Sequence, residues 1–235
     1  MSVHILAVHN VLNTSTAKWF AFGQNPAVAG TLEDIWSFGG RHTEIATAAE
    51  LKVSSSSGSD TFNVEIEGLD ADWNPQTVTQ ALAGQTETAV GSGVTWIRVL
   101  SMHNVSAVPA VGDVYCYLDD TVASGVPQTQ TKVQLKMPIG FERSMAARQS
   151  VPLGKRGNII QIAGYISAAQ ASEGRLMYRE FGEVAEVRRI FNIYFSGERI
   201  PYIIPLECEA KSDIFFLATG NGLISAEVNG FYENA

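Results

Sequence analysis

Short stretches in which apolar and polar residues alternate strictly recur along this chain, and they constrain its fold more than any other feature. In residues 61–67 every second side chain is hydrophobic, and the same alternation returns in residues 132–137. A period of two places successive side chains on opposite faces of a β-strand, so one face is buried and the other is wet. The chain is therefore expected to fold as strands that share a core.

About ten to twelve such segments follow one another from residue 49 onward, and turn-forming residues separate them at the spacing of a sandwich or jelly roll. The Ser, Gly and Asp residues of 54–60 form one turn signal, and the Gly-Asn-Gly sequence of 220–222 forms another. Helical periodicity is nearly absent, and only residues 43–51 could form a short helix. These patterns predict an all-β fold, an antiparallel β-sandwich that is jelly-roll-like.

Residues 1–45 keep neither the strand period of two residues nor the helical period of 3.6 residues for long, and they are expected to form an irregular N-terminal arm. The arm is rich in large aromatic side chains, which need a place to be buried when they lie outside regular elements. They can fold back on the domain or insert into a neighbouring subunit, and the sequence leaves both open. If the arm docks, its partner interface consists of Trp19, Phe20, Phe22, Trp36 and Phe38.

The rest of the chain, residues 46–235, is expected to form one β-sandwich domain. A length of 235 residues suits one large β domain or two small ones. No stretch after residue 60 has the composition of an interdomain linker, which favours a single sandwich. The alternative is that residues 150–235 fold as a separate half.

The acidic balance of the chain argues against two classes of partner. With 24 Asp and Glu against 16 Lys and Arg, the formal net charge is −8. Such a chain attracts neither nucleic-acid phosphates nor an anionic membrane through its overall field. No run of about 18 apolar residues could span a bilayer, and the N-terminus lacks the pattern of a secretory signal. We therefore expect a soluble protein made in a cytoplasm, with no nucleic-acid and no membrane partner.

Catalytic residue types occur in the sequence, but not in catalytic patterns. A serine or cysteine nucleophile needs a histidine base. The four histidines are His4, His9, His42 and His103, and none stands beside a nucleophile motif. The sequence also has no metalloprotease or phosphate-loop motif. We expect that the protein is not an enzyme.

Two pairs of acids, Asp70 with Asp72 and Asp119 with Asp120, are the nearest approach to a glycosidase pair or a calcium site. Both pairs lie in turn sequences, where aspartate is favoured because its side chain bonds to the nearby backbone. Turn formation is the preferred interpretation, so we expect no metal and no cofactor.

Five residues of apparent strands and turns have alternative interpretations. Cys116 and Cys208 lack metal-type or redox-type spacing, so we expect buried small hydrophobic side chains, although the sequence leaves a disulfide open. Tyr115 and Tyr117 share one sheet face, where they either pack in the core or stack on a sugar or a partner. Trp73, in a turn, is either a contact residue or a lid over one end of the sandwich.

A set of turn and strand segments occurs together in this chain: IWSFGG (35–40), AAELKVSSSS (48–57), VEIEGLDADWN (64–74), WIRV (96–99), GDVY (112–115), IG (139–140) and VPLGK (151–155). In these segments the chain resembles a group of small virion-associated proteins of tailed bacteriophages that are common in aquatic phages. The resemblance runs from about residue 35 to the end. The first 35 residues depart from the usual pattern of the group.

The resemblance implies a β-sandwich protein that is present in multiple copies on the phage particle. We expect a structural virion protein, assembled in the host cytoplasm, that acts as a capsid decoration or cement protein bridging capsid subunits. Its partners would be the major capsid protein or other virion proteins, and copies of itself, with a trimer as the first guess. The alternative is a tail or fibre component that contacts the host surface or its glycans.

Overall fold

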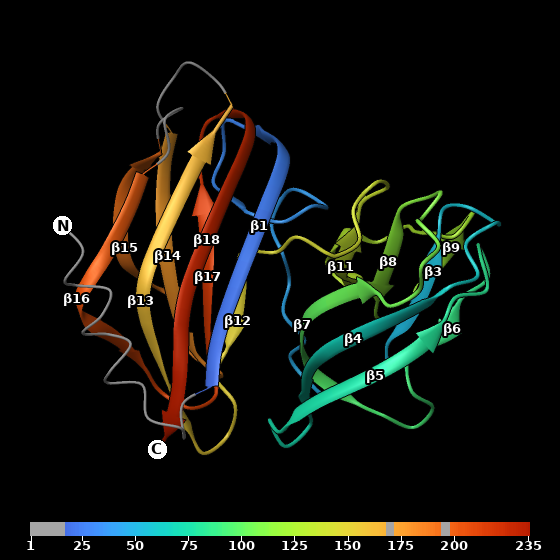
Figure 1. The fold of residues 1–235 in the computed structure, drawn as a ribbon, viewed down its shortest axis with the longest axis horizontal. Helices are drawn as coiled ribbons and strands as arrows, with labels where there is room; N and C mark the ends of the chain where they lie inside the picture. The colour runs from blue at the N-terminus through green and yellow to red at the C-terminus, as the bar shows by residue number, and fades with distance from the viewer. Residues whose placement is uncertain (1–16, 168–171, 194–197) are drawn as a thin grey trace.

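The computed structural model of the chain describes residues 17–167, 172–193 and 198–235, and it shows a protein built almost entirely from β-strands (Figure 1). Within these ranges no helix has the length and hydrophobicity to cross a bilayer. The elements in chain order are β1 (Ala17–Ala29), β2 (Glu33–Asp34), β3 (Lys52–Ser55), β4 (Asn63–Asp70), β5 (Pro75–Ala81), β6 (Thr88–Ala89), β7 (Trp96–Asn104), β8 (Val114–Tyr117), β9 (Val122–Ala123), β10 (Val126–Pro127), the 3-10 turn η1 (Gln130–Lys132), β11 (Val133–Met137), β12 (Arg148–Ser150), β13 (Lys155–Ile166), β14 (Ser172–Glu180), β15 (Glu186–Ile193), β16 (Glu198–Cys208), β17 (Ser212–Ala218) and β18 (Asn221–Asn234).

Residues 17–35 and 147–235 form one lobe, here called the roll, on the left of Figure 1. One sheet has the order β1-β18-β13-β16 and the other has the order β12-β17-β14-β15. From β12 onward every connection crosses between the two sheets, except the β14–β15 hairpin. Two four-stranded sheets wound in this order form a jelly roll. The expectation of an all-β, jelly-roll-like sandwich is therefore confirmed for this lobe.

Residues 36–146 form a second lobe, here called the inserted lobe, on the right of Figure 1. Its sheets are β11-β8-β3-β6 and β5-β4-β7, with the β9–β10 hairpin beside them. The alternating segments recognised in the sequence supply its core: Val64 and Ile66 in β4, and Val133 and Leu135 in β11, have no exposed surface. The two lobes therefore bury separate clusters of apolar side chains.

The inserted lobe interrupts a single edge strand of the roll. Both β2 and β12 pair antiparallel with β17, one after the other along the same edge. Between them, Ile35 donates its N–H to the carbonyl of Phe216 at 3.1 Å, while the carbonyl of Ala147 accepts the N–H of Phe216 at 3.1 Å. The position opposite Phe216 is therefore shared by two residues: Ile35 supplies its N–H donor, and Ala147 supplies its carbonyl acceptor. The chain leaves the roll and returns to it at the same point.

The expectation of an irregular N-terminal arm is corrected by this arrangement. Residues 1–16 lie outside the described residues, but residues 17–29 are not an irregular arm: they form β1, which pairs with β18 along its length. In the sequence of β1, Gly23 and Pro26 interrupt the alternation of apolar and polar residues that would indicate a strand. Gly23 is needed because a Cβ there would lie 2.1 Å from the backbone of both Ile35 and Ala147.

The expected single domain over residues 46–235 also differs from the packing observed. The boundaries between the apolar clusters fall at residues 35–36 and 146–147. No linker marks these points because the chain passes between the lobes as paired strands, and Trp36 still bridges to Ala146 across the junction. The short helix considered for residues 43–51 does not form; the segment is extended and irregular.

Candidate functional site

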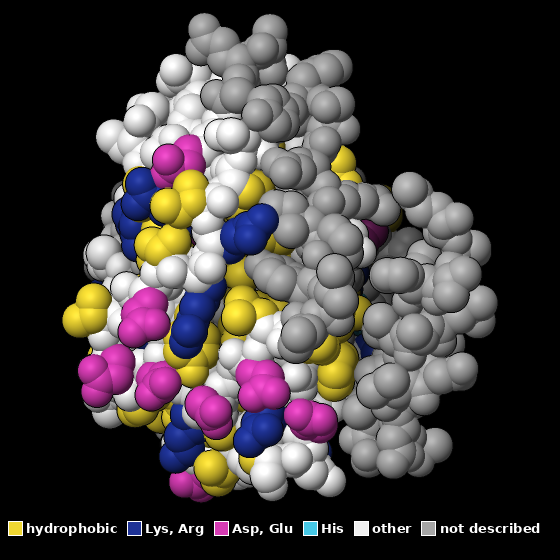
Figure 2. Space-filling view, turned by 90° about the vertical axis from the view of Figure 1, so that its left-hand side faces the viewer, with side chains coloured by type: hydrophobic (Ala, Val, Ile, Leu, Met, Phe, Trp, Pro, Cys, Tyr) yellow, Lys and Arg dark blue, Asp and Glu magenta, His cyan; other side chains and the backbone are white. Residues whose placement is uncertain are grey.

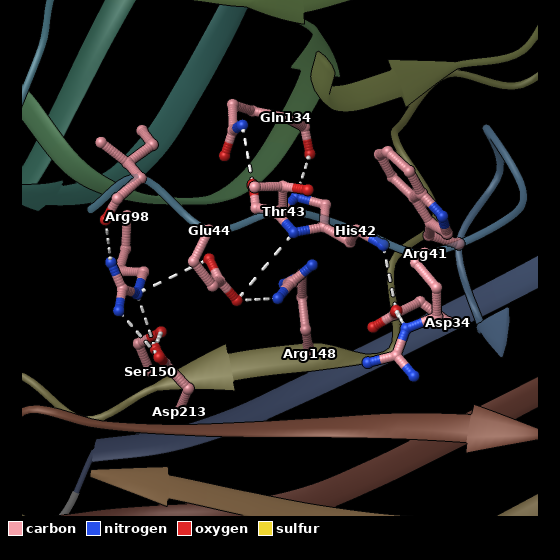
Figure 3. A network of polar contacts seen from close by, with 12 residues as sticks. Asp34, Arg41, His42, Thr43, Glu44, Arg98, Gln134, Arg148, Ser150 and Asp213 are labelled. Atoms are coloured by element: carbon pink, nitrogen blue, oxygen red, sulfur yellow. Dashed lines mark hydrogen bonds and ion pairs between the residues drawn. The ribbon is translucent and has the colours of Figure 1, made fainter. Parts of the chain in front are cut away.

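The roll and the inserted lobe meet at a buried cluster of charged side chains, shown in Figure 3. Arg98 comes from β7 of the inserted lobe, and its guanidinium forms a two-pronged pair with Asp213 of β17, with Nε–Oδ1 at 2.7 Å and Nη2–Oδ2 at 2.8 Å. The side chains of Arg98 and Asp213 are 4% and 2% exposed. Paired, charge-assisted hydrogen bonds of this kind are both strong and directional.

The remaining bonding capacity of this pair is also used. Nη1 of Arg98 donates to the carbonyl of Ile45 at 2.9 Å. Asp213 accepts a hydrogen bond from the hydroxyl of Ser150 at 2.7 Å and from Nη2 of Arg179 at 2.8 Å. A buried ion pair is tolerated when its leftover donors and acceptors are satisfied in this way.

Aromatic rings close the cluster on one side. The guanidinium of Arg98 lies 4.9 Å from the ring centre of Trp73 and 5.5 Å from that of Phe181. The two rings are 5.1 Å apart and edge to face. Trp73 belongs to the inserted lobe and Phe181 to the roll, so Trp73 is a contact residue between the lobes.

Glu44 connects the same cluster to a second arginine of the roll. Its carboxylate pairs with Arg148 of β12, and it also lies 3.6 Å from Nε of Arg98 and 3.3 Å from Nη2 of Arg179. Three arginines from two lobes therefore surround two carboxylates. This geometry fixes the orientation of the inserted lobe on the roll.

His42 is buried beside these arginines. Its Nε2 lies 3.2 Å from the carbonyl of Gln134, and its backbone N–H donates to Asp34 at 3.0 Å. Burial, together with the positive charges of Arg148, Arg179 and Arg98, holds the pKa of His42 well below its usual value of 6.5. His42 is therefore neutral in the folded protein at neutral pH.

The acids of the cluster shift in opposite directions. Burial favours a higher pKa for Asp213, but its hydrogen bonds and ion pair with Arg98 outweigh burial and leave the pKa below the usual 3.8. Burial dominates at Asp34 and raises its pKa despite the charge of Arg148. Asp213 is thus ionised beside Arg98 at neutral pH.

The neutral state of His42 predicts that acid weakens the protein. The unfolded chain takes up a proton near pH 6.5, while the folded His42 takes it up only at a lower pH, so stability falls as the pH drops below about 6.5. One such group gives a slope of up to about 1.4 kcal/mol per pH unit. Protonation of Asp213 further lowers the stability at a pH below the ordinary pKa of 3.8, because its ion pair with Arg98 is then lost. The raised pKa of Asp34 has the opposite effect, since the folded state binds this proton more readily than the unfolded chain. Urea unfolding at pH 7.5, 6.5 and 5.5 measures the slope.

The control for this measurement is the second described histidine. His42→Gln is expected to reduce the change in the free energy of unfolding between pH 7.5 and pH 5.5. The part of the slope that is assigned to His42 is expected to persist in His103→Gln, because His103 contacts Glu65 and not the arginines of the cluster. An unchanged slope in His42→Gln would contradict this assignment.

The residues proposed from the sequence as a partner interface are not brought together by the structure. Trp19 packs in the core of the roll, 5.9 Å from the ring of Tyr232. Trp36 is in the core of the inserted lobe, and the half-buried Phe38 packs against that core. Only Phe20, which is 54% exposed, and the half-buried Phe22 face outward. Trp19 and Trp36 are core residues because their segments form a strand of the roll and a bridge at the start of the inserted lobe.

The other residues considered in the sequence have structural positions. Tyr115 and Tyr117 are both buried in the inserted lobe, which removes them as a surface for sugars. Cys116 and Cys208 are both free and buried, and burial raises the pKa of each thiol to about 12. His4 and His9 lie outside the described residues.

Asp70 and Asp120 form backbone contacts, as expected of turn aspartates, whereas the side chain of Asp119 pairs with a lysine. Asp70 accepts hydrogen bonds from the N–H groups of Asp72 and Asn74, both at 2.9 Å. Asp120 accepts from Thr129, while Asp119 pairs with Lys52 at 2.6 Å. Among the residues that the structure describes, no group of three or more His, Cys, Asp or Glu could hold a metal ion.

A cleft of about 270 Å³ lies between the roll and the inserted lobe. One wall is the free edge of β1 with Phe20 and Phe22, and the other is formed by parts of β4, β5 and β7. Its polar side chains include Glu67, Gln76 and Arg143. The cleft is small for a ligand site, since typical pockets measure about 300–1,000 Å³.

Exposed apolar side chains gather at two places on the described surface. One is the turn and outer strand of the β14–β15 hairpin, where Phe181, Val184, Val187 and Ile190 are 43–86% exposed. On the side of the roll turned to the viewer in Figure 2, hydrophobic side chains are interspersed with acidic and basic ones. The second place is at the end of the inserted lobe, on the loops that follow β7 and β11.

Comparison with solved structures gives weakly similar chains, among them two from infectious bursal disease virus. No family model matches the sequence, and no curated protein shows significant similarity to it. A structure of the infectious bursal disease virus Gt strain is 7% identical, with a TM-score of 0.22, over 93% of this chain and 72% of that chain. The infectious bursal disease virus VP2 subviral particle is 7% identical, with a TM-score of 0.15, over 93% of this chain and 76% of that chain. Similarity at this level carries no argument about the function of the present chain.

Proposed function

We propose that this protein is a structural component of a tailed-bacteriophage virion, a capsid decoration protein that bridges neighbouring subunits of the shell. The observation that carries the proposal is the combination of a jelly roll with a second lobe clamped to it by buried ion pairs. Jelly rolls recur among viral capsid and lectin domains, and this use of the fold is an analogy that needs a direct test.

The described surface suits a bridging role. A bridging protein needs two contact surfaces at a fixed distance, and the cluster around Arg98 and Asp213 fixes the two lobes relative to each other. Each lobe carries exposed apolar side chains, on the β14–β15 hairpin and on the loops after β7 and β11. Burial of such surface against a shell stabilises the contact by about 25 cal/mol per Å².

One observation favours a second candidate, a tail or fibre component that contacts host glycans. The cleft between the lobes places the exposed Phe20 near polar side chains such as Gln76 and Arg143. A ring beside hydrogen-bonding groups is suited to a sugar. This version of the glycan proposal uses the cleft in place of Tyr115 and Tyr117, which are buried.

Immunogold electron microscopy separates the two candidates. Antibodies against the purified protein are applied to particles of the phage that encodes it. Gold over the head supports the decoration role, whereas gold confined to the tail supports the second candidate. Particles without label, in a preparation whose major capsid protein is labelled by its own antibody, would reject both.

A further inference from the structure

The second exposed apolar surface, here called the apolar tip, lies on two loops of the inserted lobe that are hydrogen-bonded to each other. It consists of Val105, Val108 and Val111 from the loop after β7, and of Ile139 and Phe141 from the loop after β11. These five side chains are 45–60% exposed. Exposed apolar side chains that cluster, unlike scattered ones, mark sites of interaction.

The two loops of the apolar tip are held in place by their own hydrogen bonds. Nδ2 of Asn104 donates to the carbonyl of Val108 and to the carboxylate of Glu142, both at 2.7 Å, which ties one loop to the other. Asp113 accepts the N–H of Ile139 at 2.8 Å, and Asp60 accepts the N–H of Val111 at 2.8 Å. A surface ordered before binding loses little entropy when it binds.

The apolar tip differs from the other exposed apolar surface in its charge. Residues 105–111 and 139–141 contain no Asp, Glu, Lys or Arg. On the β14–β15 hairpin, by contrast, the exposed apolar residues alternate with Glu183, Glu186, Arg188 and Arg189. Glu142 and Arg143 follow directly at the edge of the apolar tip. A binding partner that covers the five apolar side chains should therefore be mainly apolar, because a polar or charged group buried against them without a hydrogen-bond partner costs free energy.

The chain itself contains a segment of that chemistry. Residues 1–16 contain no Asp, Glu, Lys or Arg, although the whole chain has 40 such residues, 16 basic and 24 acidic. Seven of the ten positions in residues 3–12 are Val, Ile, Leu or Ala. The segment joins the roll at Ala17, so in full extension it reaches up to about 50 Å from that point. That length is sufficient to reach a neighbouring molecule.

We propose that the apolar tip binds residues 3–12 of a second copy of this chain. Each copy then offers one apolar tip and one N-terminal segment, so the contact joins copies head to tail and closes into a ring where the rotation allows. The expectation that such contacts form on a virion rests on the proposed function, in which many copies lie side by side on a particle. The contact itself can be measured on the purified protein.

The first experiment measures self-association of the full chain by sedimentation velocity over a range of concentrations. Val108→Glu in the apolar tip and Ile5→Asp in the N-terminal segment are each expected to raise the dissociation constant at least tenfold. Val108 lies outside the two apolar cores, and circular dichroism checks that each variant keeps its fold. Val184→Glu, on the charged hairpin at an 86% exposed side chain, is the matched control and should associate like the unchanged protein.

The second experiment identifies the contact directly. One preparation carries Val8→Cys and another carries Val108→Cys, and the two are mixed and oxidised; the native Cys116 and Cys208 are buried and do not compete. A disulfide-linked dimer of one chain of each kind is expected, while each preparation alone should give little. A chain carrying both cysteines that forms only an internal disulfide, or a wild type that stays monomeric at every concentration, would overturn the proposal. Neither result affects the labelling of virions.

Discussion

Replacing Arg98 with alanine is expected to lower the free energy of unfolding by about 3–5 kcal/mol, the usual effect of removing one member of a buried ion pair. Asp213 would then stay buried with only Arg179 and Ser150 as side-chain partners. The stacking of the guanidinium on Trp73 and Phe181 would be lost as well. Urea unfolding at pH 7.5, followed by tryptophan fluorescence, measures the effect.

A surface ion pair of the roll provides the control. Arg175 and Glu173 are paired in β14, but their side chains are 33% and 38% exposed. Arg175→Ala should cost less than about 1 kcal/mol, since exposed pairs contribute little. The double variant Arg98→Ala/Asp213→Ala should lose less than the sum of its single changes, because neither charge is left alone. A loss in Arg98→Ala no larger than in Arg175→Ala would show that the cluster does not hold the lobes.

Deleting residues 36–147 is expected to leave a folded roll. The register of β17 places Asp34 opposite Leu217 and Arg148 opposite Phe215, with one strand position between them. Joining Ile35 to Arg148 fills that position with one residue and restores an uninterrupted strand. Circular dichroism should show β-structure that melts in one cooperative transition.

A deletion that differs by one residue tests the register itself. Removing residues 36–146 keeps Ala147, which adds one position and turns Arg148 from the outer face of the sheet toward the core. Burying that charge without a partner should lower the free energy of unfolding by at least about 3 kcal/mol relative to the first deletion. Equal stability of the two deletions would argue against a single interrupted strand.

The strands of the inserted lobe could be predicted from the sequence because their faces differ clearly. Residues 61–67 and 132–137 alternate, and the predicted inward residues Val64 and Val133 are fully buried. The first strand of the roll was missed for a physical reason. Its inward face includes Gly23, which the close approach of Ile35 and Ala147 requires, so a key inward position carries no apolar side chain.

The insertion and the buried cluster depend on pairing between residues far apart in the chain, which local periodicity cannot show. A weaker signal for the cluster was present. Arg98 is a lone charge within the apolar run Trp96–Leu100, and Asp213 directly precedes the apolar run of residues 214–218. Two strands that each bury one charge, of opposite sign, are good candidates to meet. Aromatic content alone could not separate partner contacts from core positions, because large aromatics such as Trp19 and Trp36 are favoured in both.

The pairing of β1 with β18 has a consequence for synthesis on the ribosome. The inserted lobe is a continuous stretch of chain and can form as soon as residue 146 has emerged. The roll cannot close until residues 221–234 are made, because β18 is the neighbour of both β1 and β13. Until then an apolar strand carrying Trp19 stays without its partner, and such strands favour aggregation. The yield of soluble protein should therefore be lost abruptly when the chain is truncated within its last fifteen residues.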